Sequence, residues 1–303
     1  MGTSITTCLL AAGHPVIAFD KDISRRRMLR RRVYALLREM RLEKLVSKEP
    51  AALTKKLTVA DDLGAFGETV LVIECIFEDL DAKRDILRKI EEAVGPEVLI
   101  GSNTSALPVT ELQRGARHPE RILGIHWAEP AHITRFMEVI CGNQTDVSNA
   151  ERVLRFARRW NKEPTLVRRD IRGFITNRIM YAMMREAFYL VENGYATPAD
   201  VDRSVRNDMG YWITMAGPFR FMDLTGIPAY AAVMHDLLPD LCRDTQVPML
   251  MQELTGSGAR GVSNAKGFYS YTPAQAKRWE KRFLEFSYDI RALALKYAEK
   301  PED

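Results

Sequence analysis

A histidine and a glutamate in one short stretch of the sequence have the chemistry to move a proton. His126 follows an apolar run that begins at Ile122, Glu138 lies inside a second apolar run, and Pro130 falls between them. Two apolar runs around a proline-containing connection predict two strands joined by a turn. A turn centred near His132 places His126 opposite Glu138, and directly opposed residues have Cβ atoms about 4.5–5.5 Å apart.

Such a pair would act as a general base and its orienting acid. A carboxylate beside an imidazole fixes the tautomer of the ring and stabilises the imidazolium, so the second ring nitrogen can take a proton from a substrate. The alternative is a histidine satisfied in the core beside an unrelated glutamate at a strand edge. A zinc site made of His126, His132 and Glu138 is a more remote interpretation, because no residues that would orient such ligands stand out. We therefore expect no metal.

The composition is that of an ordinary soluble protein. Of its 303 residues, 46% are hydrophobic and 28% are charged, and this length favours two domains. The apolar runs are shorter than the roughly 20 residues that span a bilayer. The apolar stretch at the N-terminus lacks the basic region that comes first in a signal peptide. The net charge of +4 is mild. It suits an anionic ligand but gives no reason to expect nucleic acid or a membrane.

The cysteines indicate a reducing compartment. The sequence has four, Cys8, Cys75, Cys141 and Cys242, and they lie far apart without the spacing of a metal site. Scattered cysteines of this kind are typical of reduced thiols in intracellular proteins. We therefore expect a cytoplasmic protein without disulfide bonds.

The N-terminal residues match the second half of a mononucleotide-binding unit. Apolar spacing predicts a helix over 1–12 that ends at Gly13, and residues 15–19 predict a buried strand that ends at Asp20. In a complete unit, a strand ending in Gly-x-Gly precedes that helix. Here only the third glycine has a candidate, Gly2, and Asp20 follows at about the 20-residue interval of an acid that binds the ribose 2′-hydroxyl. The alternative is an ordinary N-terminal glycine and an ordinary strand-end carboxylate. We expect the missing strand to be encoded in frame upstream, and its absence to leave a gap in the sheet.

Alternating strands and helices up to residue 170 predict a Rossmann-like, doubly wound α/β sheet. The further strands are expected at 57–60, 69–74, 98–102 and 165–167, and the helices at 22–46, 79–94, 109–114 and 147–160. Ser105 follows the strand at 98–102, and polar residues at the carboxyl ends of parallel strands are where such sheets bind ligands. The hairpin that carries His126 adds an antiparallel portion at one side.

Beyond Asp170 the strand signals end. A long amphipathic helix is expected over 174–191, and further helices are expected from Thr197, Gly217, Pro228, about Asp240, and Pro273. The sequence therefore predicts an α/β domain over 1–170 and an all-helical domain over 171–303.

The run RRRMLRRR at residues 25–32 lies in a predicted helix with apolar periodicity. One interpretation is a solvated helix face. The other is an electrostatic patch for a phosphate-bearing substrate. A nucleic-acid arm is less favoured, because such arms are disordered tails rather than amphipathic helices.

Five motifs together resemble the L-3-hydroxyacyl-CoA dehydrogenase family, which includes 3-hydroxybutyryl-CoA dehydrogenases, over nearly the whole chain. They are SNTS at 102–105, GIHWAEP followed by MEVI within 124–140, GFITNR at 173–178, AGPFRFMDLTG at 216–226 and KGFYSY at 266–271. The resemblance implies reversible, NAD-dependent oxidation of the 3-hydroxyl of a 3-hydroxyacyl-CoA, as in fatty acid metabolism. It also implies a homodimer formed through the helical domain.

The resemblance implies a role for each matching residue. His126 would take the hydroxyl proton, and Glu138 would hold the ring and balance its charge. Ser105 and Asn177 would hydrogen-bond the reacting oxygen and the bound ligands. The residues that would line the cofactor are Gly2, Asp20, Glu78, Lys83, Ser105 and Glu129. Asp20 favours NAD, since a carboxylate repels the 2′-phosphate of NADP.

Two departures from the family pattern concern the substrate. Glu129 stands where the family commonly has asparagine, beside the nicotinamide. The segment 211–215 is longer than in short-chain acyl-CoA members and resembles the gulonate and carnitine dehydrogenases, whose substrates carry no CoA. A dehydrogenase of a free hydroxy acid is therefore the nearest alternative. A non-catalytic, crystallin-like relative is the second, and the intact set of site residues argues against it.

Overall fold

The computed structural model describes residues 1–298, which form two compact units. The first unit runs from Met1 to Arg178, and the second begins at Ile179. The strand signals of the sequence end at Asp170, but the first unit continues to Arg178. It does so because Thr176 and Asn177 hydrogen-bond to residues of the first unit. Among the described residues, no helix combines the length and apolarity needed to cross a bilayer.

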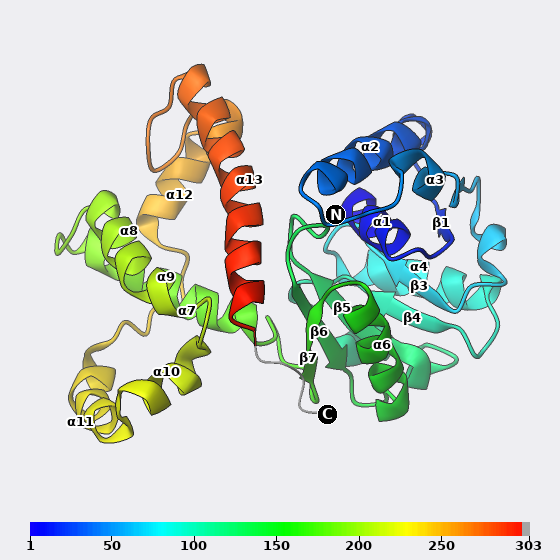
Figure 1. Ribbon diagram of the computed structural model, residues 1–303. Helices are drawn as coiled ribbons and strands as arrows, with labels where there is room; N and C mark the ends of the chain where they lie inside the picture. Colours follow the sequence, from blue (N-terminus) through cyan, green and yellow to red (C-terminus); the bar gives the residue numbers. More distant parts are fainter. Residues whose placement is uncertain (299–303) are drawn as a thin grey trace. The chain divides into compact units, whose positions relative to one another are not determined.

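The first unit contains two sheets (Figure 1). One is a parallel pair, and the other has five strands in the order β3-β4-β5-β6-β7, of which only β5 and β6 are antiparallel neighbours. The strands are β1 (Val16–Ala18), β2 (Leu57–Val59), β3 (Leu71–Glu74), β4 (Leu99–Ser102), β5 (Ile122–Trp127), β6 (Phe136–Cys141) and β7 (Glu163–Val167). The expected interruption of the sheet is therefore present between the β1–β2 pair and β3.

Helices cover both faces of the five-stranded sheet. They are α4 (Leu80–Ala93) and α5 (Val109–Gln113) on one face, and α1 (Gly2–Ala11) and α6 (Val147–Arg159) on the other. Successive side chains of a strand point to opposite faces of the sheet, so the core has two parts. In β4, Ile100 packs toward α4 and its neighbour Leu99 packs toward α6. All residues of β5 are buried, as expected for an interior strand covered on both faces.

Aspartates fix the starts of the main helices of this unit. Asp22 accepts the N–H groups of Ser24 and Arg25 at the start of α2 (Ile23–Leu42), and Asp79 accepts that of Ala82 at the start of α4. Such caps satisfy N–H groups that have no partner within the helix. A short helix, α3 (Pro50–Thr54), follows α2 and was not predicted from the sequence.

The second unit is built from helices over its described residues. The helices that begin at or after the boundary region are α7 (Thr176–Glu192), α8 (Pro198–Asn207), α9 (Met209–Trp212), α10 (Gly217–Thr225), α11 (Ile227–Leu237), α12 (Met249–Gly256) and α13 (Pro273–Lys296). The helix predicted from about Asp240 begins only at Met249. Pro248 precedes it as the N-cap, and the residue before a proline is disfavoured in the helical region, so the helix cannot extend back.

Candidate active site

The antiparallel pairing of β5 and β6 places His126 directly opposite Glu138, which confirms the register predicted from the sequence. The imidazole Nδ1 lies 2.9 Å from Oε2 of Glu138. Both residues are buried, with 6% and 1% of their surfaces exposed. The ring is therefore fixed through Nδ1, which leaves Nε2 as the nitrogen available for proton transfer.

Two aromatic rings hold the His126 imidazole. Phe136 packs edge-on with a centroid distance of 5.3 Å, and Phe174 packs at 5.7 Å. Phe174 is fully buried and has a φ of 51°, a left-handed conformation that is costly for an aromatic residue. Phe174 thus contacts the imidazole of His126 directly, and this packing keeps the imidazole in one orientation.

The second carboxylate oxygen of Glu138 is held by the backbone at the start of α7. Oε1 accepts the N–H of Ile175 at 3.1 Å and that of Thr176 at 3.0 Å. Burial by itself would raise the pKa of Glu138, but the hydrogen bonds from His126, Thr176 and Ile175 and the charge of His126 outweigh it and hold the pKa below its usual value. Glu138 is therefore ionised at neutral pH and suited to balance an imidazolium.

The sequence did not reveal these backbone donors. Gly173 and Phe174 both have positive φ, 80° and 51°, and this turn directs the N–H groups that follow toward Glu138. The signal available in the sequence was Gly173 immediately before a predicted helix, because glycine adopts positive φ without strain.

Asn177 joins this helix start to Ser105. Its Nδ2 donates to the backbone oxygen of Ser105 at 2.7 Å. Because Thr176 bonds to Glu138, the first turn of α7 contacts both Ser105 and Glu138. The structure therefore brings the four residues predicted for catalysis, including His126, into one site within the first unit.

Asp20, predicted to bind the ribose 2′-hydroxyl, and Glu78, predicted to line the cofactor, follow the carboxyl ends of parallel strands. The side chain of Asp20, after β1, is 39% exposed, and that of Glu78, after β3, is 38% exposed. Half-exposed acceptors at this edge fit a dinucleotide. Gly2 begins α1, where an added Cβ would meet Cys75 at 3.9 Å, an ordinary contact. A Cβ would therefore fit at position 2, so packing within this structure does not require glycine there.

Lys83 and Glu129 lie in contrasting surroundings. Lys83 is only 1% exposed and its ammonium bonds both oxygens of Glu74, at 2.8 and 3.0 Å. Lys83, which was predicted to line the cofactor, thus lies beneath the surface with its ammonium paired to Glu74. Glu129, between β5 and β6, has a side chain that is 57% exposed and pairs with the Met1 amine at 3.4 Å.

Glu74 was not predicted from the sequence as a site residue. It is 4% exposed and accepts hydrogen bonds from Lys83 and from the hydroxyl of Ser102. The signal that marks it is an acidic residue at the end of a buried apolar strand, followed by a lysine in the first turn of the next helix. A buried carboxylate requires a partner of this kind.

The zinc interpretation finds no support. Nδ1 of His132 lies 2.7 Å from the hydroxyl of Ser4 on α1, so His132 belongs to a different contact from His126 and Glu138. Within residues 1–298, no three histidine, cysteine or acidic side chains gather as metal ligands would.

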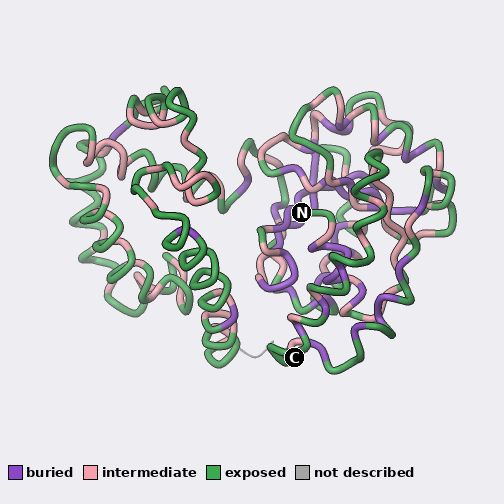
Figure 2. Tube along the Cα trace, turned by 90° about the horizontal axis from the view of Figure 1, so that it is seen from above, coloured by how far each residue is buried: buried purple, intermediate pink, exposed green. Residues whose placement is uncertain are grey.

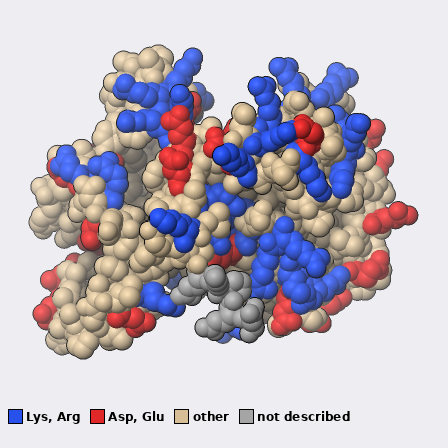
Figure 3. All heavy atoms as spheres, viewed as in Figure 1, with Lys and Arg blue, Asp and Glu red and all other residues tan. Residues whose placement is uncertain are grey.

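The arginine run on α2 divides into anchors and surface residues. Arg26 bonds Asp61 at 2.8 Å, and Arg30 donates to the carbonyls of Thr54 and Leu57 at 2.8 and 2.7 Å. These contacts attach α2 to the region of β2. Figure 3 shows lysine and arginine side chains gathered over α2, where the exposed arginines of the run are Arg25, Arg27, Arg30, Arg31 and Arg32.

Two sequence families match the chain in succession. The family described as 3-hydroxyacyl-CoA dehydrogenase, NAD binding domain, matches residues 1–171. The family described as 3-hydroxyacyl-CoA dehydrogenase, C-terminal domain, matches residues 173–271. The first match alone covers more than half of the chain and contains His126 and Glu138.

Relatives of the chain carry names with different substrates. A 5-formyl-3-hydroxy-2-methylpyridine 4-carboxylate 5-dehydrogenase from Mesorhizobium japonicum is 34% identical, over 91% of this chain and 89% of its own length. A solved structure of a 5-dehydrogenase for the same pyridine acid, described as an NAD+ dependent dismutase, has a TM-score of 0.90 at 30% identity, with 97% and 95% of the two chains covered. The structure of (S)-3-hydroxybutyryl-CoA dehydrogenase from Ralstonia eutropha has a TM-score of 0.74 at 26% identity, with 90% and 95% covered.

Proposed function

The chain belongs to the 3-hydroxyacyl-CoA dehydrogenase family, and from that premise we propose that His126 and Glu138 move the proton in an NAD-dependent oxidation of a hydroxyl-bearing carbon. The observation that carries this proposal is the 2.9 Å contact between Nδ1 of His126 and Oε2 of Glu138 in a buried hairpin. An imidazole held by an ionised carboxylate is the arrangement that general base catalysis requires.

Each side chain of the site has a defined task in this proposal. Nε2 of His126 accepts the hydroxyl proton, since Nδ1 is engaged by Glu138. The negative charge of Glu138 balances the imidazolium that forms, and its backbone donors keep it in place. Ser105 and Asn177 supply neutral donors to the reacting oxygen, which carries partial negative charge during the reaction.

NAD, when bound, accepts the hydride from the same carbon. Asp20 would hold ribose hydroxyls and disfavour NADP by repelling its 2′-phosphate. Glu78 and Ser105 would lie along the nicotinamide side, at the carboxyl ends of β3 and β4. Lys83 would act through Glu78 rather than through a contact with the cofactor, because its ammonium is already enclosed.

For the substrate, we propose a small carboxylate without CoA, either a hydroxy acid or an aldehyde that is oxidised as its hydrate. The hydrate carries hydroxyl and hydrogen on one carbon, so loss of a proton and a hydride gives a carboxylic acid. Support comes from the TM-score of 0.90 to the pyridine carboxylic acid dehydrogenase, against 0.74 to the 3-hydroxybutyryl-CoA dehydrogenase. The extended segment 211–215 favours the same class.

The second candidate is a 3-hydroxyacyl-CoA. Both matching families carry that name, and the exposed arginines of α2 would suit the phosphates of CoA. The site itself serves either substrate, because in both the proton leaves from a hydroxyl oxygen and the hydride leaves from the carbon that bears it.

Steady-state rates separate the two substrate classes. We expect NADH formation from NAD and 5-formyl-3-hydroxy-2-methylpyridine 4-carboxylate, gulonate or carnitine, with kcat/KM at least about 10²-fold above that for acetoacetyl-CoA and NADH. A preference for acetoacetyl-CoA of that size would reverse the substrate assignment. No turnover with any of them, together with no binding in an NADH titration, would favour the non-catalytic alternative.

We further propose that the second unit forms a homodimer. Between residues 179 and 298 the buried residues are Cys242, Ala276 and Tyr288, whereas buried residues are abundant in the first unit (Figure 2). Large apolar side chains on its helices are instead exposed, including Phe219 at 79%, Phe283 at 62% and Phe286 at 58%. Helices need a partner for their apolar faces, and apolar surfaces of this extent are typical of obligate interfaces.

Light scattering after size exclusion tests the dimer. We expect twice the mass of the 303-residue chain for the wild type. The double substitution Phe283→Glu and Phe286→Glu should give monomers and lower the thermal midpoint, because charges replace apolar side chains at the interface. Lys281→Glu, on the same helix with an already charged and exposed side chain, is the control and should remain dimeric. A wild-type monomer at micromolar concentration would contradict the proposal.

We also propose a reducing, cytoplasmic location. No disulfide joins the four cysteines, all of which lie in the described part of the chain, and Cys8, Cys141 and Cys242 are buried. Burial raises the pKa of the Cys75 thiol to about 12, so this group stays protonated and unreactive near neutral pH. Because the fold contains no disulfide between these cysteines, it does not depend on an oxidising compartment.

A further inference from the structure

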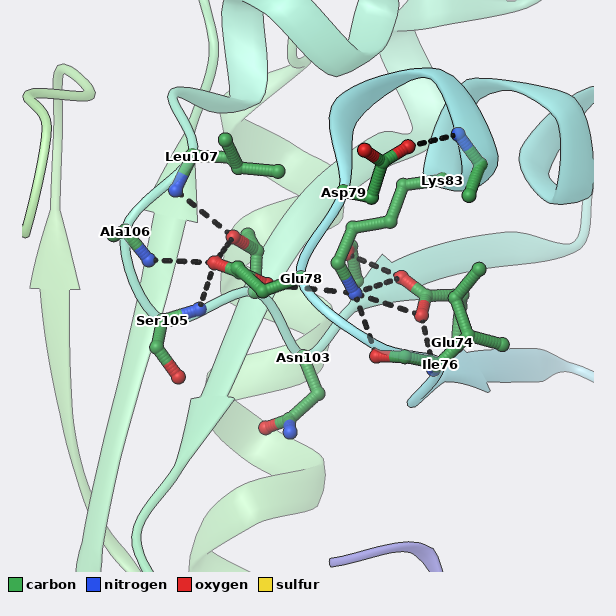
Figure 4. Close-up of polar contacts among 12 residues, drawn as sticks. Glu74, Ile76, Glu78, Asp79, Lys83, Asn103, Ser105, Ala106 and Leu107 are labelled. Carbon is green, nitrogen blue, oxygen red and sulfur yellow. Dashed lines mark hydrogen bonds and ion pairs between the residues drawn. The ribbon is translucent and has the colours of Figure 1, made fainter. Parts of the chain in front are cut away.

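A buried ion pair lies beneath the proposed nicotinamide side of the site (Figure 4). The ammonium of Lys83 bonds Oε1 and Oε2 of Glu74 at 2.8 and 3.0 Å and the carbonyl of Ile76 at 3.2 Å. Glu74 also accepts the hydroxyl of Ser102 at 2.6 Å and the N–H of Ile76. Both oxygens of Glu74 are thus engaged, and the carboxylate fixes the position of the ammonium.

Glu78 connects this pair to the turn that carries Ser105. Its Oε2 lies 3.7 Å from the Lys83 ammonium. Its Oε1 accepts the hydroxyl of Thr104 at 2.6 Å and the N–H groups of Ser105 and Ala106 at 2.9 Å each. Figure 4 shows the Glu78 side chain reaching between Lys83 and the backbone of this turn.

The charge of Glu78 is maintained by these contacts. Burial would raise the pKa of its carboxyl, but the hydrogen bonds from Thr104, Ala106 and Ser105 and the charge of Lys83 lower it below the usual value. An ionised Glu78 bonds the turn more strongly than a neutral acid would, because charge-assisted hydrogen bonds are about twice as strong as neutral ones.

We propose that Glu74 is a positioning residue for the active site: it holds the Lys83 ammonium closer to its own oxygens than to Glu78, whose pairing with Lys83 stays at 3.7 Å, and thereby keeps Glu78 on the Ser105 turn. The proposal deepens the proposed function, since it rests on the roles given there to Ser105 and Glu78. Glu74 itself lies under the surface and, in this proposal, acts on Glu78 through Lys83.

The distances explain why the charge of Glu74 matters. Lys83 lies nearer to both oxygens of Glu74, at 2.8 and 3.0 Å, than to Glu78, at 3.7 Å. A buried ammonium that loses its carboxylate carries a large desolvation cost. The carboxylate that remains within reach is Glu78, which would turn toward Lys83 and release the N–H groups of the turn.

Amide hydrogen exchange measures this release without a substrate. In Glu74→Gln we expect the Ser105 and Ala106 amides to exchange about tenfold faster, as the loss of a charge-assisted hydrogen bond predicts. The Ile175 and Thr176 amides, which bond Glu138, should be unchanged in the same sample. Unchanged exchange at Ser105 and Ala106 in this variant would overturn the proposal.

A double variant separates positioning from mere stabilisation. Glu74→Gln combined with Lys83→Gln removes the unpaired ammonium, so Glu78 should stay on the turn and the exchange rates should return toward those of the wild type. A purely structural role for the pair predicts rates at least as fast as in the single variant, which would contradict the proposal. The double variant also provides the test if the single variant does not fold.

Glu91 offers a matched control in the same unit. It is 7% exposed, accepts the N–H groups of Arg117 and His118, and lies 3.6 Å from the buried Arg121. It lies toward the opposite end of α4 from Lys83. Glu91→Gln should lower thermal stability but leave the exchange of the Ser105 and Ala106 amides unchanged; faster exchange there would mean that any buried pair of this unit has the same effect.

NADH titration gives the second readout. We expect weaker NADH binding in Glu74→Gln, recovery in the double variant, and wild-type affinity in Glu91→Gln. If wild-type protein does not bind NADH, the proposed function fails, while the exchange rates still decide whether Glu74 positions the turn. If NADH affinity is the same in wild type and Glu74→Gln despite faster exchange, the turn does not serve the cofactor and the positioning role is contradicted.

Discussion

Replacing His126 with asparagine is expected to lower kcat by about 10²- to 10⁴-fold, the range of a lost general base. The amide can fill part of the space of the imidazole and still bond Glu138, but it cannot take a proton at neutral pH. NADH affinity should be unchanged, because His126 acts on the substrate hydroxyl. Single-turnover formation of NADH, followed by its absorbance, measures the chemical step directly.

The matched control for this substitution is His118→Asn. The side chain of His118 is 44% exposed and pairs with Glu120, outside the hairpin that carries the site residues. It should retain wild-type kcat. Retention of more than about a tenth of wild-type kcat in His126→Asn would exceed what the loss of a general base allows and would remove His126 from the proton-transfer step.

Glu138→Gln is expected to cost about 10- to 100-fold in kcat. The loss of a charge-assisted hydrogen bond is worth about 1.5–3 kcal/mol, and each 1.4 kcal/mol is about tenfold. A larger fall is expected if the His126 ring also changes tautomer in this variant, since the wrong nitrogen would then face the substrate. NADH affinity should again persist, so the effect falls on kcat rather than on cofactor binding. A variant with wild-type kcat would remove Glu138 from the proposed pair.

The lowered pKa of Glu138 also predicts a pH dependence of stability. A carboxyl whose folded-state pKa lies below its unfolded-state value stabilises the fold above that unfolded value, and this contribution is lost as pH falls through the folded-state pKa. The ordinary value is 4.5, so the loss begins near there and continues below it. Thermal midpoints of Glu138→Gln should therefore decline less on acidification than those of the wild type; parallel declines would contradict this.

The hairpin was predictable because its pattern is local. The apolar runs around His126 and Glu138 allow one register that buries both, and a one-residue slip would turn every side chain to the other face. The order of elements in the first unit was also predictable, because strands and helices alternate along this part of the sequence.

What the sequence did not reveal depends on contacts between distant segments. The pairing of Glu74 with Lys83 requires β3 and α4 to meet. Lys83 lies one turn before Leu87 on the buried face of α4, but the carboxylate that pairs with it there follows only from that contact. The N–H groups of Ile175 and Thr176 belong to the backbone and leave no mark on side-chain chemistry. In the second unit, Pro248 set a helix start that apolar spacing alone placed too early.

The tautomer of His126 is the most direct test of the central claim, that Glu138 holds the ring for proton transfer at Nε2. Nitrogen-15 NMR of histidine-labelled protein, assigned with His126→Asn, reports which ring nitrogen carries the proton. We predict that in the neutral ring Nδ1 carries the proton and donates to Glu138 while Nε2 carries none, with the Nδ1 proton signal lost or shifted in Glu138→Gln. A ring protonated at Nε2 alone would place the proton on the wrong nitrogen and contradict the proposed role of the pair.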